Sequence, residues 1–549
     1  MSMSRPFTAR LSHTRASLAA VSLFLCGIFV YLTSAVFIPT FYGSLRTRVL
    51  AQLVLRDDRL GGLGGSEEVR GRSGSRFLAT NDTVSIHLYD IINIDDVRKR
   101  GATPSLSRRG PFVFSKQTNK VDVIWAEDGR MVSYRENVTY EFHPSQSTGT
   151  LRDRITTVNV PLVGVLEVIM DRYGDDGAMS ARILQVVAGL VEKWQEGGII
   201  DGLFMNRSVG ELLGGYTDGL LEVLGRVGVE GVDPWFGLLA GGVDAGRSAQ
   251  WTGVDNMDLV AELHAWHGMR FIRGWDADLD PPEVVRGTGG RQFAPGMTAR
   301  LQDAGVYDDE NDSRMNYTVW VGDAYRAFDL RAVRGREAAE IRSADGHGVV
   351  ANVKMLTAGS EAFEVSSRYQ QMYRGLLNIT GPTNQGKAGV SLFLSLPGFC
   401  GVEAADVVDS IEGVSCLCDT GDDACIEQHI RLDLEPLTGM VIQARKALML
   451  STHIGPRYRA VDSGISSEAF VPIMEVEERG SATLDELQDV TRLQRAVGLC
   501  VAGATYLPWV SWVMIAGGIV LVSLSTVRVT GDPANEVHAQ DDGYERLPM

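Results

Sequence analysis

The longest uncharged apolar run covers residues 496–527, with Arg495 and Arg528 at its two ends. A second apolar run, residues 16–45, lies near the other end of the chain. A helix needs about 20 apolar residues to cross the hydrocarbon core, and all of its backbone polar groups must be paired there. We therefore predict transmembrane helices at residues 16–42 and 497–527. The first could instead be a cleaved signal peptide, but its apolar length favours an uncleaved anchor.

The second run is longer than one crossing requires. Tyr506, Trp509 and Trp512 resemble an aromatic belt at a membrane interface, and Pro508 suits the start of a helix. The membrane-crossing part is therefore expected nearer residues 508–527, with the preceding apolar residues as an approach or an extension by tilt.

Most of the segment between the two runs has the alternating pattern of strands. β-branched and aromatic residues alternate with polar ones, which is typical of half-buried strands. Runs of this kind are residues 84–92, 132–142, 259–272, 390–396 and 432–444, and a further strand begins at 111–114. The glycine-rich and charged segment 56–76 is expected to be a surface loop.

Residues 160–224 have a helical pattern instead. Residues 160–170 are apolar on nearly every face, and glycines at 174 and 177 end that stretch. From Ser180, apolar residues recur at helical spacing. Ser208 and Glu211 match a capping box, in which each residue bonds the other's backbone N–H. Periodicity alone favours a helical subdomain that only packs, and a ligand- or partner-binding cap is the alternative.

Charge, sequons and cysteines indicate a lumenal or extracellular domain. The 549 residues carry a formal net charge of −17, which argues against nucleic acid as a partner. Four clustered cysteines then predict disulfides rather than a zinc site; three pairings are possible, and Cys416–Cys418 has poor bridge geometry. The four are Cys400, Cys416, Cys418 and Cys425. Six N-x-[ST] sequons, all between the apolar runs, are at Asn81, Asn137, Asn206, Asn311, Asn316 and Asn378.

The sequence contains no recognisable catalytic or metal-binding motif. It lacks a G-x-S-x-G elbow, a Walker A loop and an H-E-x-x-H helix. His264 and His267 lie in the strand-like run 259–272, where positions three apart point to opposite faces. We therefore predict no metal, no cofactor and no enzymatic activity.

Several segments, in order, resemble the class B scavenger receptors. The resemblance covers most of residues 15–525. It rests on residues 88–97, 109–114, 140–147, 159–161, 207–218, 252–256, Trp275, 287–288, 395–397, 432–439 and 471–473. Some family cysteines are missing: Trp275 is followed by Asp-Ala-Asp, and Tyr325 stands where a cysteine is expected.

The resemblance implies an α+β protein. Its ectodomain, residues 43–496, would be an antiparallel β-barrel with an apical helical bundle at about 160–224 and a hydrophobic tunnel. Transmembrane helices would anchor it at both ends, with residues 1–15 and 528–549 cytosolic. The expected ligands are lipids, fatty acids or lipoproteins, although acids outnumber bases over residues 160–196. Apical residues expected to contact ligand are Val163, Leu166, Ile169, Ile183, Val187 and Leu190.

Two functions follow from the resemblance. The first is a receptor that moves hydrophobic ligand through the tunnel toward the membrane. The alternative is a lysosomal sorting receptor that binds a protein partner at its apex without lipid transfer. The tail residues Tyr544 and Leu547 resemble a tyrosine-based sorting signal, which a clathrin adaptor would read. The expected location is the plasma membrane, the endosome–lysosome system or both.

Overall fold

The computed structural model describes most of the chain in two compact units. One unit comprises Met1–Val49 and Thr491–Met549, and the other is Leu50–Val490. The described residues are 5–38, 40, 79–173, 202–219, 235–239, 241–256, 259–275, 283–287, 316–333, 338–342, 348–363, 373–384, 389–416, 430–435, 440–459 and 461–530, with a few single positions between 182 and 222.

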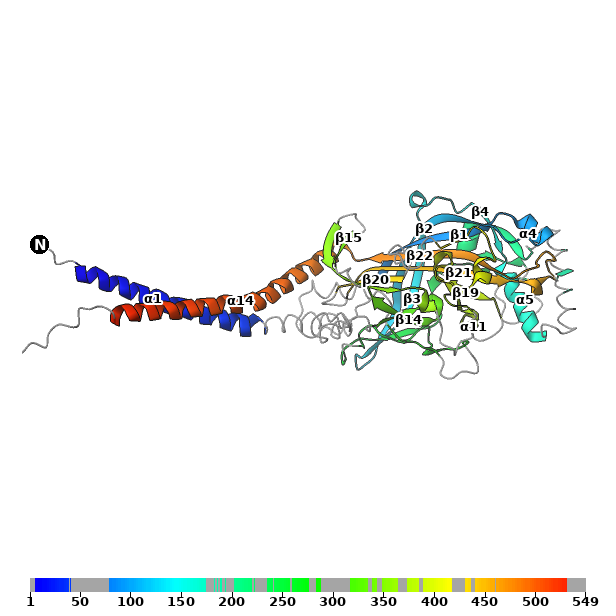
Figure 1. The fold of residues 1–549 in the computed structure, drawn as a ribbon. Helices are drawn as coiled ribbons and strands as arrows, with labels where there is room; N and C mark the ends of the chain where they lie inside the picture. Colours follow the sequence, from blue (N-terminus) through cyan, green and yellow to red (C-terminus); the bar gives the residue numbers. More distant parts are fainter. Residues whose placement is uncertain are drawn as a thin grey trace, which may run out of the picture. The chain divides into compact units, whose positions relative to one another are not determined.

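The first unit contains two long apolar helices that lie side by side (Figure 1). Helix α1 (Arg5–Leu32) continues into a π-helical turn, η1 (Thr33–Phe37), and α14 (Leu484–Thr530) enters this unit at residue 491. Their candidate membrane spans are Leu18–Val36 and Thr505–Leu524. The second candidate span includes the aromatic residues around Pro508, which lies inside the helix and does not start it.

Small side chains allow the two helices to approach closely. A Cβ atom on Gly27 would lie 3.0 Å from the backbone nitrogen of Ile515, and one on Gly518 would lie 3.0 Å from the backbone nitrogen of Phe24. The rings of Tyr31 and Trp512 meet edge to face, with centroids 6.0 Å apart. Packing through small residues is how helices associate in lipid, where apolar surface gives little preference for protein over lipid tails.

The second unit is built on one antiparallel sheet, 14-stranded within the described residues. Its main path is β10 (Leu263–Ala265), β9 (Ser248–Trp251), β3 (Met131–Phe142), β2 (Leu106–Trp125), β1 (Ala79–Ile91), β22 (Ala469–Ser481), β21 (Val441–Ile454), β20 (Ile430–Leu434), β17 (Lys354–Ala358), β14 (Arg326–Ala332) and β13 (Asn316–Val321). Three short strands attach to it: β8 (Gly242–Val243), β18 (Leu377–Asn378) and β19 (Leu392–Ser395).

Two-stranded ribbons and short helices surround this sheet. The ribbons are β4–β5 (Arg154–Val158, Phe204–Ser208), β6–β7 (Tyr216–Thr217, Trp235–Phe236), β11–β12 (Phe271–Ile272, Glu283–Val284) and β15–β16 (Ala338–Arg342, Gly348–Asn352). The α-helices are α4 (Ile94–Arg100), α5 (Val160–Tyr173), α7 (Val209–Gly214), α11 (Thr380–Thr383) and α12 (Ala405–Val408). The 3₁₀ turns are η3 (Pro144–Gln146), η5 (Gly322–Ala324), η6 (Ser360–Phe363), η7 (Pro397–Phe399) and η8 (Pro456–Tyr458).

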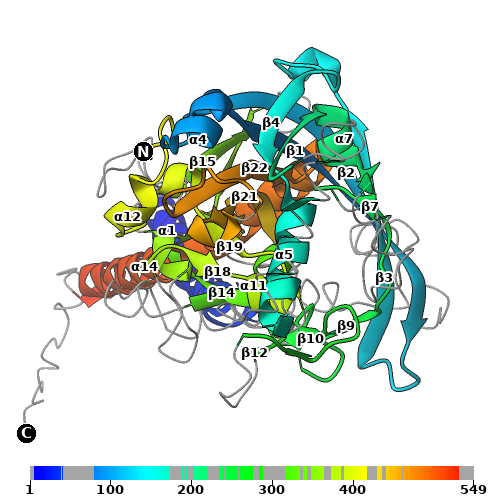
Figure 2. The same cartoon turned by 90° about the vertical axis from the view of Figure 1, so that its right-hand side faces the viewer.

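The sheet curls until its two edge strands nearly meet. In Figure 2, β22, β1, β2 and β3 lead round to β9 and β10, with α5 at the end nearest the viewer. Leu263 of β10 and Trp320 of β13 belong to the same buried apolar cluster, although they lie at opposite ends of the strand order. Gly287 adjoins β13 so closely that a Cβ atom would lie 2.8 Å from the carbonyl oxygen of Thr318. The predicted antiparallel barrel with accompanying helices is thereby confirmed.

Several sequence predictions match these elements. The strands expected at 84–92 and 132–142 are β1 and β3, and the helix expected at 160–170 is α5. The run 259–272 was wrongly predicted as one strand, because Ala261 and His267 have positive φ and divide it into turns and short strands. The run 432–444 is likewise two strands, β20 and the start of β21. Segment 56–76 lies outside the described residues.

Candidate functional site

A buried asparagine, Asn159, directly precedes the first residue of helix α5. Asn159 is buried; its Oδ1 accepts a hydrogen bond from Leu162 N at 3.2 Å, and its Nδ2 donates to Gly202 O at 2.9 Å. The side chain thus satisfies one of the N–H groups that a helix leaves unpaired at its start. It also joins the helix to the segment before β5, which fixes where α5 begins at this end of the sheet.

The predicted apical residues on α5 point inward. Val163 and Leu166 are fully buried in the largest apolar cluster, and Ile169 packs against it while partly exposed. Val168, on the other side of the helix, is 40% exposed. Val163 and Leu166 are therefore part of the core in this structure, and a contact with ligand would have to come from within the domain. The predicted residues Ile183, Val187 and Leu190 lie outside the described residues.

The Glu167 carboxylate joins helix α5 to the turn η8, which follows strand β21. Glu167 accepts a hydrogen bond from the hydroxyl of Tyr458 and lies 2.8 Å from the guanidinium of Arg457, both in η8. Burial and then the Glu167 carboxylate raise the pKa of Tyr458 above its ordinary value. Sequence reasoning missed this anchor, because Glu167 and Tyr458 are 291 positions apart.

The concave face of the sheet carries a group of four charged residues, which we call the internal charge cluster. Its members are Lys116 of β2, Asp323 of η5, Lys446 of β21 and Glu478 of β22. The two Glu478 oxygens lie 3.0 Å from the ammonium groups of Lys116 and Lys446. Lys446 also forms an ion pair with Asp323.

The Lys446–Asp323 pair identifies the concave face. Two strands separate β21 from β14, so in a flat sheet these strands would lie about 14 Å apart. A lysine side chain on β21 can reach the turn before β14 only if the sheet bends toward the face that carries Lys446. Register places Val476, Leu448 and Phe114 on the same face as the cluster. The concave face is thus apolar on one side of the cluster, where Leu448 and Val476 pair across β21 and β22.

Electrostatics holds the cluster in its ionised form. Burial lowers the pKa of Lys446, but the Asp323 and Glu478 carboxylates outweigh burial and raise it overall. Burial also opposes the charge on Lys116, and Glu478 again raises the pKa above its ordinary value. The Lys446 ammonium holds the pKa of Asp323 below its usual range. These shifts favour the charged forms of Lys116, Lys446 and Asp323.

A third lysine, Lys120, lies on the same face of the sheet, four residues after Lys116 along β2. The Lys120 ammonium is 4.2 Å from the centre of the Tyr134 ring, and its cross-strand partner is Glu136. Burial lowers the pKa of Lys120 to about 7, although Glu136 opposes the shift. The Tyr134 hydroxyl donates to Gln250 Oε1 at 2.7 Å, which joins β3 to β9 inside the barrel.

The opposite, convex face has a separate polar network. Arg108 donates through Nε and Nη2 to the two carboxylate oxygens of Glu475, at 2.9 and 2.8 Å, and lies 3.0 Å from His87 Nδ1. The Tyr89 hydroxyl donates to the same carboxylate at 3.2 Å. Burial and then Arg108 lower the pKa of His87 to about 4. The network joins β2, β1 and β22 side by side and leaves His87 neutral.

Two of the predicted glycosylation sites project from the convex face. Asn81 is exposed on β1, and Asn137, half-exposed on β3, lies opposite Asn119 of the intervening strand. Asn206 is exposed on β5 and its Oδ1 accepts from Arg154, while Asn378 accepts a hydrogen bond from Thr380 N at 3.0 Å. Asn316 begins β13, and Asn311 lies outside the described residues.

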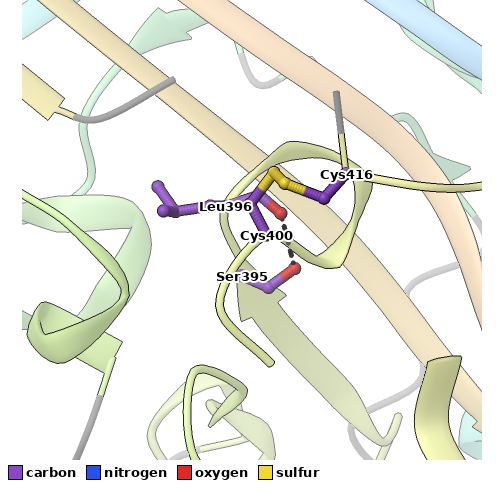
Figure 3. The surroundings of a disulfide bond; sticks show 4 residues. All are labelled: Ser395, Leu396, Cys400 and Cys416. Carbon is purple, nitrogen blue, oxygen red and sulfur yellow. Dashed lines mark hydrogen bonds between the residues drawn. A yellow bond between two sulfur atoms is a disulfide. The ribbon is translucent and has the colours of Figure 1, made fainter. Parts of the chain in front are cut away.

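The predicted disulfide is present within the cysteine-rich segment. Cys400 and Cys416 are bonded, across a sequence separation of 16. Figure 3 shows the bond beside Ser395 and Leu396, where the Ser395 hydroxyl donates to the Leu396 carbonyl at 3.0 Å. Cys418 and Cys425 lie outside the described residues, as do Tyr544 and Leu547 of the tail.

The two histidines considered as ligands have other roles. The His264 ring meets Trp251 edge to face, and the His267 ring stacks on Trp266 with Nε2 3.0 Å from Asp244. Among the residues that the structure describes, no group of three His, Cys, Asp or Glu side chains could hold a metal ion.

Comparison with known proteins shows which family and which proteins this chain is similar to. Residues 80–529 match the CD36 family. Lysosome membrane protein 2 of Homo sapiens is 24% identical over 395 residues, which are 71% of this chain and 73% of that protein. Scavenger receptor class B member 1 of Sus scrofa is 23% identical over 450 residues, 81% of this chain and 78% of that protein. The match includes the whole curled sheet and the second candidate span, so this chain, a membrane protein, belongs to the CD36 family of class B scavenger receptors.

Proposed function

We propose that this protein is a receptor that binds lipids or lipoprotein-like ligands and moves hydrophobic ligand through its barrel toward the membrane. The observation that carries the proposal is the curled sheet, whose concave face is largely apolar and whose edges meet at Leu263 and Trp320. An amphiphile gains about 0.8 kcal/mol for each CH₂ group that it buries. Such a face, tethered to the bilayer at both ends of the chain, would suit a hydrophobic ligand. No step in this function needs catalysis.

Lipid that remains bound during purification would test the proposal directly. The full-length chain, extracted in mild detergent, is expected to carry lipid that mass spectrometry identifies at a fixed stoichiometry. A fluorescent fatty acid should compete for the same site. If no lipid co-purifies and no fatty acid binds, the proposal loses its basis.

Two substitutions at adjacent positions of β2 can show whether ligand passes along the concave face of the sheet. Thr118 and Gln117 are adjacent on β2; Thr118 shares the concave face with Lys116, and Gln117 is exposed on the convex face. Thr118→Trp should reduce lipid uptake several-fold by filling the interior, while Gln117→Trp should leave it unchanged. Equal uptake by both variants and the wild type would contradict transport through the barrel.

The second candidate function is sorting of a bound protein to lysosomes. It is favoured by the similarity to a lysosome membrane protein and by the tail residues Tyr544 and Leu547. In this case Thr118→Trp should spare partner binding, and Tyr544→Ala should move the protein from lysosomes to the cell surface. Unchanged surface and lysosomal levels of Tyr544→Ala would mean that the tail signal is not used.

Both functions require the same topology. We propose that residues 43–496 are lumenal or extracellular and that residues 1–15 and 528–549 are cytosolic. The exposed convex-face position of Asn81 supports this arrangement, because a glycan there would not disturb the core. Glycosidase treatment of the wild type and of Asn81→Gln should show one fewer glycan on the variant.

A further inference from the structure

The ribbon β11–β12 covers the seam where the two edges of the sheet meet. Its inward side chains, Ile272 and Val285, are buried in the same apolar cluster as Leu263 of β10 and Trp320 of β13. Leu263 N donates to Gly287 O at 2.9 Å, which joins the chain just after β12 to β10. The ribbon is therefore packed on both edge strands, and its outer side chains project from a supported backbone.

The outer face of this ribbon is apolar at its centre. Phe271 and Val284 lie directly opposite each other in the register, and they are 48% and 43% exposed. The residue that follows each of them is buried, as the two-residue alternation of strands requires. We call this outer face the seam patch; its members are Phe271, Arg273, Val284 and Arg286.

Arginines lie at both ends of the seam patch. Arg273 comes two positions after Phe271, and Arg286 comes two positions after Val284, so each shares the outer face with its neighbour. Both arginines are exposed, and neither has a carboxylate partner among the residues that the structure describes. Arg270 adds a third exposed guanidinium, 5.9 Å from the centre of the Phe271 ring. In a chain of net charge −17, this face combines local positive charge with an apolar centre.

The register determines the spacing of the two arginines. Because the strands are antiparallel, Arg273 lies two positions to one side of the Phe271–Val284 pair and Arg286 lies two positions to the other. Four positions at about 3.4 Å each put the arginines about 14 Å apart along the ribbon. An extended chain covers the same length in four residues, and its residues i, i+2 and i+4 point to one side. The seam patch thus matches an extended segment with an acid, an apolar residue and a second acid at alternate positions.

We propose that the seam patch binds an extended acidic segment of a partner protein, with its carboxylates on Arg273 and Arg286 and its apolar side chain over the pair between them. A guanidinium can bind a carboxylate through two parallel hydrogen bonds, and arginine and aromatic residues are enriched where proteins bind one another. An anionic lipid surface is the other possible partner, but two apolar side chains offer little to insert into a bilayer. The inference goes beyond the proposed function, because it uses neither the concave face of the sheet nor the apical helices.

A synthetic peptide is the probe for this surface. A fluorescein-labelled Glu-Thr-Leu-Thr-Glu peptide, flanked by Gly-Ser, should bind the full-length protein in detergent, as measured by fluorescence anisotropy. The matched Gln-Thr-Leu-Thr-Gln peptide should bind at least about tenfold more weakly, because it lacks both charges. Raising the salt from about 50 to about 500 mM should weaken binding of the acidic peptide, because salt screens exposed charges. Absence of binding to the wild type, or equal binding of the two peptides, would overturn the proposal.

Single substitutions locate the binding surface. Arg273→Gln and Arg286→Gln should each weaken binding of the acidic peptide by about three- to tenfold. Arg152→Gln is the matched control, because Arg152 is an exposed arginine in the turn before β4 and the substitution removes the same charge. Equal binding by all three variants would place the peptide elsewhere and contradict the proposal. The double variant Arg273→Glu, Arg286→Glu should bind a Lys-Thr-Leu-Thr-Lys peptide instead, a gain that an unfolded variant would not show.

Two further measurements address other occupants of the seam patch. If vesicles of phosphatidylserine and phosphatidylcholine bind the wild type more tightly than the acidic peptide does, and the glutamine variants lose this binding, the partner is a lipid surface and the proposal is wrong. The chain between β11 and β12 carries Asp276, Asp278 and Asp280. Changing all three to asparagine should leave peptide binding unchanged; stronger binding would mean that this segment is the occupant. None of these results depends on lipid transport, so the proposed function stands or falls separately.

Discussion

His87 is a buried base whose protonation opposes folding. Its folded pKa is about 4, whereas an unperturbed histidine has a pKa of 6.5. Between these values the unfolded chain binds a proton that the folded chain does not, so stability falls as the pH drops from 6.5 toward 4. The cost at pH 5 is about 2 kcal/mol. The groups that face the ring are Arg108, Glu475 and Glu477.

A glutamine at position 87 should remove this dependence. The Gln side chain can still accept a hydrogen bond from Arg108, but it does not titrate. We expect thermal unfolding of the full chain in detergent to be less sensitive to acid for His87→Gln than for the wild type between pH 7 and pH 5. Identical pH profiles would mean that His87 is already protonated in the folded protein or that its site relaxes.

At single positions, the sequence indicated residue types more readily than their contacts. Tyr325 stands where the resemblance led us to expect a cysteine, and Trp275, which matches the family, is followed by Asp-Ala-Asp in place of family cysteines. In the structure the Trp275 indole donates to the Tyr325 carbonyl at 3.3 Å, and both rings pack against the apolar cluster that contains Leu263 and Trp320. Contacts across 50 residues depend on how the sheet edges meet, which local pattern does not encode.

Among the elements, α7 has a capping box that was predicted from the sequence and is confirmed by the structure. Glu211 N donates to Ser208 Oγ at 3.2 Å, and Ser208 N donates to Glu211 Oε2 at 2.9 Å. Ser208→Ala should lower stability by about 1 kcal/mol, as loss of an N-cap usually does. Thermal unfolding in detergent would measure the change.

The serine also completes the sequon at Asn206, so the substitution needs a matched control. Ser208→Asn keeps a good capping side chain and removes the sequon, as Ser208→Ala does. The difference between these two variants therefore reports the cap alone. If both unfold at the same temperature, the capping box contributes nothing measurable to this fold.

Local pattern predicted elements well where side chains alternate or repeat regularly, as in β3 and α5. It did not reveal the internal charge cluster. Lys446 lies between Ala444 and Leu448 on one face of β21, and that was the available signal, but its partner Asp323 is 123 positions away in a short turn. Only the curling of the sheet brings these two charges together, and curling depends on all of the strands at once.

At the scale of the whole molecule, the two apolar helices are the feature that sets this chain apart from a soluble barrel. The apolar runs predicted both helices, but hydropathy could not show that they pack on each other. Gly518 makes close approach possible: a Cβ atom there would meet the Phe24 backbone nitrogen at 3.0 Å and the Ala20 carbonyl oxygen at 3.1 Å. Backbone atoms cannot move aside as the end of a flexible side chain can.

Neighbouring glycines provide a test of this packing. Gly518→Leu should force α1 and α14 apart and lower stability in detergent by about 1 kcal/mol or more, the scale of packing interactions between membrane helices. Gly517→Leu is the matched control, because a Cβ atom there would meet only the tip of the Leu23 side chain at 3.5 Å. Both variants add the same apolar volume to the same turn of α14, so hydropathy and membrane insertion change equally. If thermal unfolding in detergent is the same for both variants, the packing of the two helices does not depend on this contact.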